Sequence, residues 1–122
     1  MIKKMSILSG GIVAAERAFF ARSVWARTRG MIGRRFKTAP FEAMVFENCS
    51  AVHCCWMIEK IDVIFVSEDF EVVKVCPHVR PWSVVCGGKG AKHAVEIAAG
   101  RAESLKLKPG VKLAFMEVDD TP

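Results

Sequence analysis

The feature that most restricts the fold of this chain is a series of short apolar segments, each four to eight residues long, beyond Pro40. The segments are rich in Val, Ile and Phe, and stretches of polar, glycine and proline residues separate them. This pattern is typical of β-strands. The strands it predicts are Phe41–Glu47, Val52–Met57, Ile61–Val66, Val72–Val75, Ala94–Ala98 and Val111–Val118.

Two short polar stretches predict turns between these strands. Ser67–Phe70 fits the tight turn of a hairpin. Lys108–Gly110 also suits a turn, because its proline presets φ and its glycine accepts positive φ. The segment between Cys76 and Lys92 is longer and contains the glycine-rich stretch Gly87–Gly90. Long ordered loops in small domains often carry function, so we expect this segment to border a site.

Helical periodicity is found in the segment Ser23–Ile32. Ser23 is the expected N-cap, because its hydroxyl can accept a hydrogen bond from a first-turn amide. The face expected to pack on the sheet, at about 100° per residue, comprises Val24, Trp25, Thr28, Met31 and Ile32. The predicted fold class is therefore α+β: a mainly antiparallel, strongly curved sheet or small barrel with one amphipathic helix packed on it.

The basic residues are concentrated at the beginning of the chain. Residues 1–37 contain nine basic residues and one acidic residue, a net charge of +8, whereas the rest of the chain has a net charge of −3. Gly30 lies among the arginines, and glycine inside a helix costs about 1 kcal/mol relative to alanine. Three arrangements would explain a glycine at this position: the close approach of another backbone, an anionic ligand between the arginines, or the end of the helix. Nucleic-acid binding is not expected, because no aromatic platform interleaves with the arginines.

A chain of 122 residues has room for one core, so residues 1–122 are expected to form a single domain. The start, Met1–Ala15, resembles a secretory signal, but Ser9–Gly11 interrupts its apolar run. We interpret it as a folded N-terminal hairpin. No apolar run is long enough to span a membrane. Five cysteines without paired spacing favour reduced thiols and a cytoplasmic location. The sequence leaves the oligomeric state open.

Four ordered motifs resemble the bacterial family catalogued as domain of unknown function 192. Arg29–Arg34 is similar to its Gly-Leu-Met-x-Arg signature, and Val52–Val66 resembles its central block, where a Met precedes an Ile/Leu-Asp-Val-x-Phe strand. Val79–Trp82 and Val95–Gly100 resemble a later proline motif and a Leu-Glu-x-x-x-Gly strand. The similar region runs from about residue 21 to residue 115. The resemblance implies a mixed α/β domain with a β-rich core and brings no established activity.

Chain direction predicts a candidate site at one end of the sheet. The strand Ile61–Val66 turns and returns along Val72–Val75, so its exit must lie beside its entry. The ligand-binding residues expected to converge there are Met57, Asp62, His78, Arg80 and Trp82. The Arg80 guanidinium could bind an anion, and the Trp82 indole could provide an apolar contact surface. The alternative is that Asp62 and Arg80 only pair with each other to hold the loop.

The sequence supports a catalytic function less strongly than a binding function. Cys76, His78 and Asp62 have the residue types of a nucleophile, a base and an orienting acid, but no signature joins them. Asp62 and Glu96 could act as paired carboxylates, or either could pair with an arginine such as Arg34 or Arg80.

Metal binding is a further alternative. On a regular strand His53, Cys55 and Met57 would share one face, a soft donor set. Residues two apart on a strand are about 6.6 Å from each other, too far for all three to bind one ion. We therefore expect neither a metal nor a cofactor. The sequence favours a non-catalytic binding or accessory module for an unknown small molecule or peptide.

Overall fold

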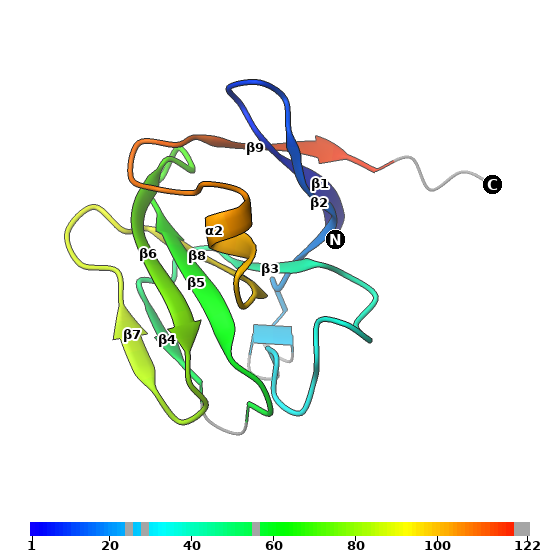
Figure 1. The fold of residues 1–122 in the computed structure, drawn as a ribbon, viewed down its shortest axis with the longest axis vertical. Helices are drawn as coiled ribbons and strands as arrows, with labels where there is room; N and C mark the ends of the chain where they lie inside the picture. Colours follow the sequence, from blue (N-terminus) through cyan, green and yellow to red (C-terminus); the bar gives the residue numbers. More distant parts are fainter. Residues whose placement is uncertain (24–25, 28–29, 55–56, 119–122) are drawn as a thin grey trace.

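The computed structural model describes residues 1–23, 26–27, 30–54 and 57–118 (Figure 1). Within these residues the protein is mostly sheet with a little helix, as the series of strand-length segments predicts. The described elements, in chain order, are β1 (Ile2–Ile7), β2 (Val13–Phe20), β3 (Ala43–Phe46), β4 (Ala51–His53), β5 (Ile61–Val66), β6 (Val72–Val79), β7 (Val84–Cys86), β8 (His93–Ala98), α2 (Arg101–Ser104) and β9 (Leu113–Glu117).

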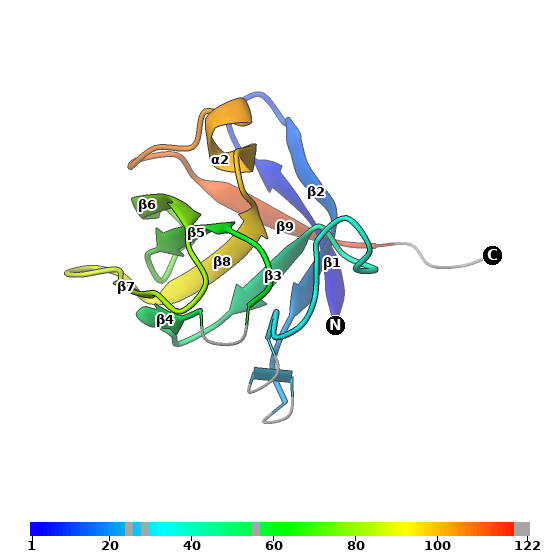
Figure 2. The same ribbon diagram turned by 60° about the horizontal axis from the view of Figure 1, so that its bottom comes forward.

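Seven of the described strands form one curved sheet in the order β6-β5-β8-β3-β2-β1-β9, and β4 pairs with β7 in a small second sheet (Figures 1 and 2). Neighbouring strands are antiparallel except β2 and β3, which are parallel. The sheet does not close into a barrel. The two end strands of the sheet are β6 and β9. Among the described residues one isolated bridge, Glu71 to Lys112, links the segments just before them, and β9 itself pairs with β1.

Both faces of the sheet are covered, which explains why all six residues of β5 are buried. Ile64 and Val66 belong to a cluster of buried apolar residues on the face covered by α2, called here the inner cluster, which also contains Ala102. Ile61, Val63 and Phe65 alternate with them and belong to the outer cluster on the opposite face. A strand covered on both sides is apolar throughout instead of alternating.

The outer cluster is covered largely by the connection between β2 and β3. Parallel strands cannot be joined by a tight turn, and here residues 21–42 make the crossover. Met31, Phe36 and Phe41 of this crossover are buried against the outer face of the sheet. The crossover therefore shapes whatever cavities lie on that face.

The expected helix at Ser23–Ile32 is shorter than predicted. The Ser23 cap is confirmed, because the Ala26 N–H donates to the Ser23 hydroxyl at 3.0 Å. Gly30 has φ +46° and its N–H donates to the Ala26 carbonyl oxygen, so the helix ends at this point. Met31 is buried as expected, but the expectation that Ile32 packs on the sheet is wrong, because Ile32 is 39% exposed. Val24, Trp25 and Thr28 lie outside the described residues.

The expected turn at Ser67–Phe70 and the N-terminal hairpin of β1 and β2 are both confirmed. The segment between Cys76 and Lys92 is more regular than predicted. Strand β6 continues to Val79, and β7 lies within the expected loop and pairs with β4. Three-residue strands such as β7 carry too little periodicity to be recognised from the sequence.

We expect Gly30→Ala to lower the free energy of unfolding, despite the better helix propensity of alanine. Its positive φ costs a residue with a Cβ about 1 kcal/mol. The nearest neighbour of the added Cβ is the phenyl ring of Phe46 at 3.4 Å, and the Arg27 carbonyl oxygen lies at 3.9 Å. Urea denaturation measures the loss.

Gly33→Ala is the matched control. Gly33 has φ +66° and open space around the position of a Cβ. A similar loss in both variants assigns the cost to the backbone, and a larger loss at Gly30 adds the contact with Phe46. A stabilised Gly30→Ala protein would contradict the prediction.

Candidate functional site

The five residues expected to form one site are divided between different places. Asp62 and His78 line a shallow recess beside α2. Met57 lines a separate cavity on the outer face, and neither of these two hollows is lined by Arg80 or Trp82. The chain-direction argument itself agrees with the register, because Ile61 pairs with Val79 at the end of the hairpin.

The Asp62 carboxylate accepts hydrogen bonds from backbone amides. It is fully buried, and it accepts hydrogen bonds from the N–H groups of His78 at 2.8 Å, Gly100 at 3.1 Å and Ala102 at 2.9 Å. His78 lies in a bulge of β6, where two residues oppose Asp62 and φ of His78 is +49°. Asp62 thus fixes the bulge and the start of α2. Its hydrogen bonds come from these amides and not from Arg80.

Trp82 and Arg80 lie at the surface beyond β6. The Trp82 side chain is 60% exposed, and its backbone N–H donates to the Cys54 carbonyl oxygen at 2.7 Å. That bond extends the pairing of β4 with β7. Arg80 is exposed as well. The two side chains therefore lie at the surface, and neither lines the hollow that Met57 lines.

One hollow on the outer face has a volume of about 310 Å³ and is called here the Glu96 cavity. It lies between the crossover, β3, β4 and β8. Its walls are mainly apolar, with a few polar groups at the mouth. The lining residues are Arg27, Gly30, Met31, Ile32, Phe46, Cys49, Ala51, Val52, His53, Met57 and Glu96.

Glu96 is the unusual member of this cavity. It lies on β8 between Met44 of β3 and Val63 of β5, both of which belong to the outer cluster. Its side chain is buried, and its Oε1 has no hydrogen-bond partner among the described residues. Burial raises the pKa of Glu96 from 4.5 to about 8. The carboxyl group is therefore mostly protonated and uncharged at neutral pH.

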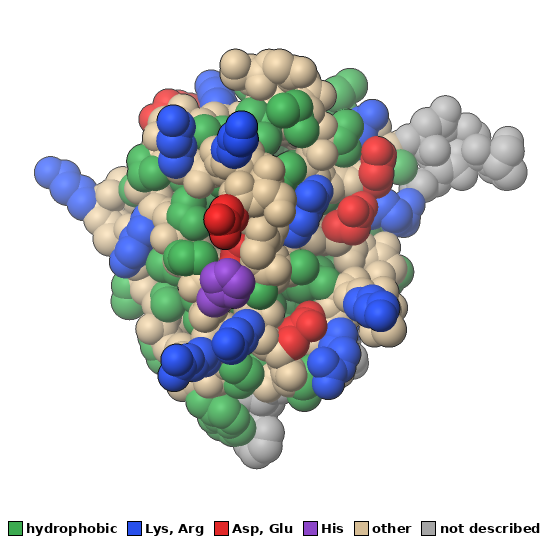
Figure 3. All heavy atoms as spheres, viewed as in Figure 1, with side chains coloured by type: hydrophobic (Ala, Val, Ile, Leu, Met, Phe, Trp, Pro, Cys, Tyr) green, Lys and Arg blue, Asp and Glu red, His purple; other side chains and the backbone are tan. Residues whose placement is uncertain are grey.

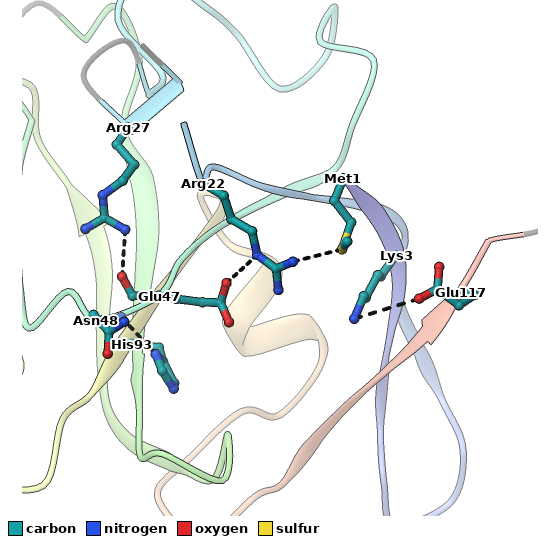
Figure 4. A network of polar contacts seen from close by, with 8 residues as sticks. All are labelled: Met1, Lys3, Arg22, Arg27, Glu47, Asn48, His93 and Glu117. Carbon is teal, nitrogen blue, oxygen red and sulfur yellow. Dashed lines mark hydrogen bonds and ion pairs between the residues drawn. The ribbon is translucent and has the colours of Figure 1, made fainter. Parts of the chain in front are cut away.

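Polar contacts fix the wall of the cavity next to the crossover (Figure 4). Arg27 Nη1 donates to the Glu47 carbonyl oxygen at 2.6 Å, and the Glu47 carboxylate accepts from Arg22 Nε at 2.6 Å. The next residue, Asn48, donates its backbone N–H to His93 Nδ1 at 3.0 Å. The two arginine contacts tie the beginning of the crossover to Glu47 and hold Arg27 at the cavity mouth, and the third contact ties the segment after β3 to β8.

From the sequence, Glu96 was a candidate only as one of two paired carboxylates, and pairing with an arginine such as Arg34 or Arg80 was the alternative. The structure places no arginine on it among the described contacts. One signal could have identified it: Glu96 is the acidic residue of the otherwise apolar stretch Ala94–Ala98. An acid in a strand buried on both faces must either find a partner or lose its charge.

Metal binding has little support in the described part of the chain. His53 and Met57 both line the Glu96 cavity, but β4 ends at His53 and Cys55 lies outside the described residues. No group of three or more His, Cys, Asp or Glu residues gathers among the residues described. The recesses formed by Asp62 and Glu96 are on opposite faces of the sheet, so the two carboxylates do not form a catalytic pair.

We expect the purified protein to contain no stoichiometric transition metal. The donors that a soft metal would need are not gathered by the described residues. Elemental analysis after dialysis provides the measurement. About one copper or zinc per chain, lost in His53→Ala, would contradict this expectation.

The surface gives no sign of a single basic patch on the face seen in Figure 3, where Lys and Arg side chains are scattered among acidic and apolar ones. The strongly basic N-terminal third is partly engaged in internal contacts, as with Arg22 and Glu47. In the part of the chain that the structure describes, no helix is long and apolar enough to cross a membrane.

Sequence comparison finds relatives of unknown function. A profile of the family DUF192, described as Uncharacterized ACR, matches residues 7–115. A UPF0127 protein of Pyrococcus horikoshii is 34% identical over 66 residues, which are 54% of this chain and 56% of that protein. A UPF0127 protein of Pyrococcus abyssi is 33% identical over 67 residues, which are 55% and 56% of the two chains. The alignments thus span about half the length of these curated relatives.

Two crystal structures share the fold. A protein of Sinorhizobium meliloti, described as a candidate transcription regulator, has a TM-score of 0.80 at 18% identity and covers 94% of both chains. A protein of unknown function from Novosphingobium aromaticivorans has a TM-score of 0.72 at 22% identity, covering 93% of this chain and 84% of its own. At these identities the likeness shows a common fold alone.

Proposed function

Because this chain belongs to the DUF192 family of uncharacterised proteins, its function has to be argued from its own residues, and we propose that it is a non-catalytic module that binds a small molecule in the Glu96 cavity. Of the residues that the sequence singled out as ligand-binding, Met57 is the one that lines this cavity. The proposed site is thus on the outer face of the sheet.

The observation that carries the proposal is Glu96, which lines a hollow of about 310 Å³ and whose buried Oε1 has no hydrogen-bond partner among the described residues. Ligand pockets of roughly 300–1,000 Å³ are usually apolar with a few polar groups that orient the ligand. Buried polar atoms without partners are rare in folded proteins, because each one costs about 1–3 kcal/mol. A ligand that pairs with Glu96 would recover that cost.

Two groups that could take part in catalysis are already engaged in hydrogen bonds to the backbone. Asp62 is used by backbone amides, and Cys49 donates its thiol to the Ala51 carbonyl oxygen at 3.0 Å. Neither group is therefore poised as a nucleophile or a base beside Glu96.

A fragment screen by protein-observed NMR tests the proposal. We expect hits to shift backbone signals of residues around Met31, Val52 and Met57, and to be lost in Val52→Trp, which fills the cavity. Val84→Trp, at an exposed position on β7, is the control and is expected to keep the hits. A library that produces no shifts at the cavity in the folded wild type would overturn the proposal.

A further inference from the structure

We infer that the ligand of the Glu96 cavity is a small, uncharged and largely apolar molecule with a carbonyl- or ether-type oxygen, and that the Glu96 carboxyl group donates a hydrogen bond to this oxygen. The inference rests on the proposed function and adds the chemical class of the ligand. It follows from what surrounds Glu96 and from what the cavity mouth offers.

The deep part of the cavity favours an uncharged ligand. Phe46, Val52 and Met57 line it with apolar atoms, and an ion placed among them would lose its hydration. Glu96 retains its proton at neutral pH, because burial raises its pKa to about 8. A protonated carboxyl group is a hydrogen-bond donor, so the matching ligand group is an acceptor.

The mouth of the cavity argues against a cationic ligand. Arg27 is held there by the Glu47 carbonyl oxygen, and its positive charge would repel an ammonium group. His53 is the other ionisable group at the exposed side. Arg27 at the entrance disfavours molecules with a positive charge. The uncharged Glu96 carboxyl group favours molecules that offer it an oxygen acceptor.

The other titratable groups that line the cavity with Glu96 come from three different segments of the chain. The helical turn after Ser23 contributes Arg27, the segment after β3 contributes Cys49, and β4 contributes His53. The sheet neighbours of Glu96, Met44 on β3 and Val63 on β5, do not titrate. Any pH dependence of binding that vanishes in Glu96→Gln therefore belongs to Glu96 itself.

A matched set of phenyl probes tests the ligand class. Acetophenone has a neutral acceptor, 1-phenylethylamine is a cation, 2-phenylpropionate is an anion and ethylbenzene has no polar group. We expect acetophenone to bind tightest at about pH 6.5, measured by NMR titration of the intact chain. Its dissociation constant should rise roughly tenfold by about pH 9, since only the protonated form is competent and about one molecule in ten then keeps the proton.

Two variants isolate the hydrogen bond. Glu96→Gln keeps a donor without a titrating group, so acetophenone should bind with little dependence on pH. Glu96→Met keeps a similar length without a donor, so acetophenone should lose its advantage over ethylbenzene. Glu103→Gln, at an exposed position in α2, is the control and should behave as wild type.

The outcomes separate this inference from the proposed function. Preference for the amine or for 2-phenylpropionate, affinity that rises towards pH 9, or an acetophenone advantage that survives in Glu96→Met would overturn the ligand class while leaving the cavity as a binding site. Failure of every probe and of the fragment library to reach the cavity would overturn the proposed function as well.

Discussion

Replacing Asp62 with alanine is expected to remove a large part of the folding stability of this domain. Its carboxylate accepts hydrogen bonds from three backbone N–H groups in the interior, and alanine would leave all three without that acceptor. Each unsatisfied buried group costs about 1–3 kcal/mol, so we expect a loss on the order of 4 kcal/mol or more. Small domains have a total stability of about 5–15 kcal/mol. Urea denaturation followed by circular dichroism measures the change.

Asp69→Ala is the matched control, because Asp69 is an exposed carboxylate in the turn at the other end of β5. It should change the free energy of unfolding by less than about 0.5 kcal/mol. If Asp62→Ala were as stable as this control, Asp62 would not hold the β6 bulge and the start of α2, and a ligand-binding role for its carboxylate would have to be reconsidered.

The second large effect is a fall in stability as pH rises, caused by Glu96. Its folded pKa is raised from 4.5 to about 8, so the folded protein binds more protons than the unfolded chain between these values. Stability from this group is fully present below about pH 4.5 and is lost as pH rises through about 8. The total loss is on the order of 5 kcal/mol, since each unit of difference between the two pKa values corresponds to about 1.36 kcal/mol.

The comparison that isolates Glu96 is the difference between wild type and Glu96→Gln across this range, because every other titratable residue is common to both proteins. The variant should lack the loss, and Glu96→Met should be more stable than wild type above pH 8. A wild type and a Gln variant whose stability curves run parallel from pH 5 to pH 9 would show that Glu96 ionises normally.

The β-rich fold could be predicted because the apolar segments have strand length and turn residues separate them. β5 matches its expected bounds, Ile61–Val66, for this reason. The helix was overestimated because the periodicity continues to Ile32, whereas a positive φ at Gly30 ends it earlier. The predicted strand Val52–Met57 corresponds to the shorter β4, whereas β7 was not predicted, because a three-residue strand leaves no periodic signal and its pairing with β4 depends on contacts between distant residues.

The candidate site could be predicted only in part. Chain direction correctly brings the entry of β5 beside the exit of β6, but it does not reveal which face of the sheet each side chain occupies. Asp62 points to the inner face and Met57 lies on the outer one, so they cannot share a pocket. Glu96 was missed as the centre of a site, because its isolation depends on the crossover folding over the outer face.

The parallel pairing of β2 with β3 bears on how such a domain can diversify. Because residues 21–42 must travel back along the sheet to make this pairing, they necessarily provide a cover for its outer face. Gly30 and Met31 of this connection line the Glu96 cavity, whereas the hydrogen-bonded ladders lie beneath it. Substitutions in one connection can therefore change the shape of the cavity and leave the pairing of the strands intact. One strand order can in this way accommodate different molecules without a new fold.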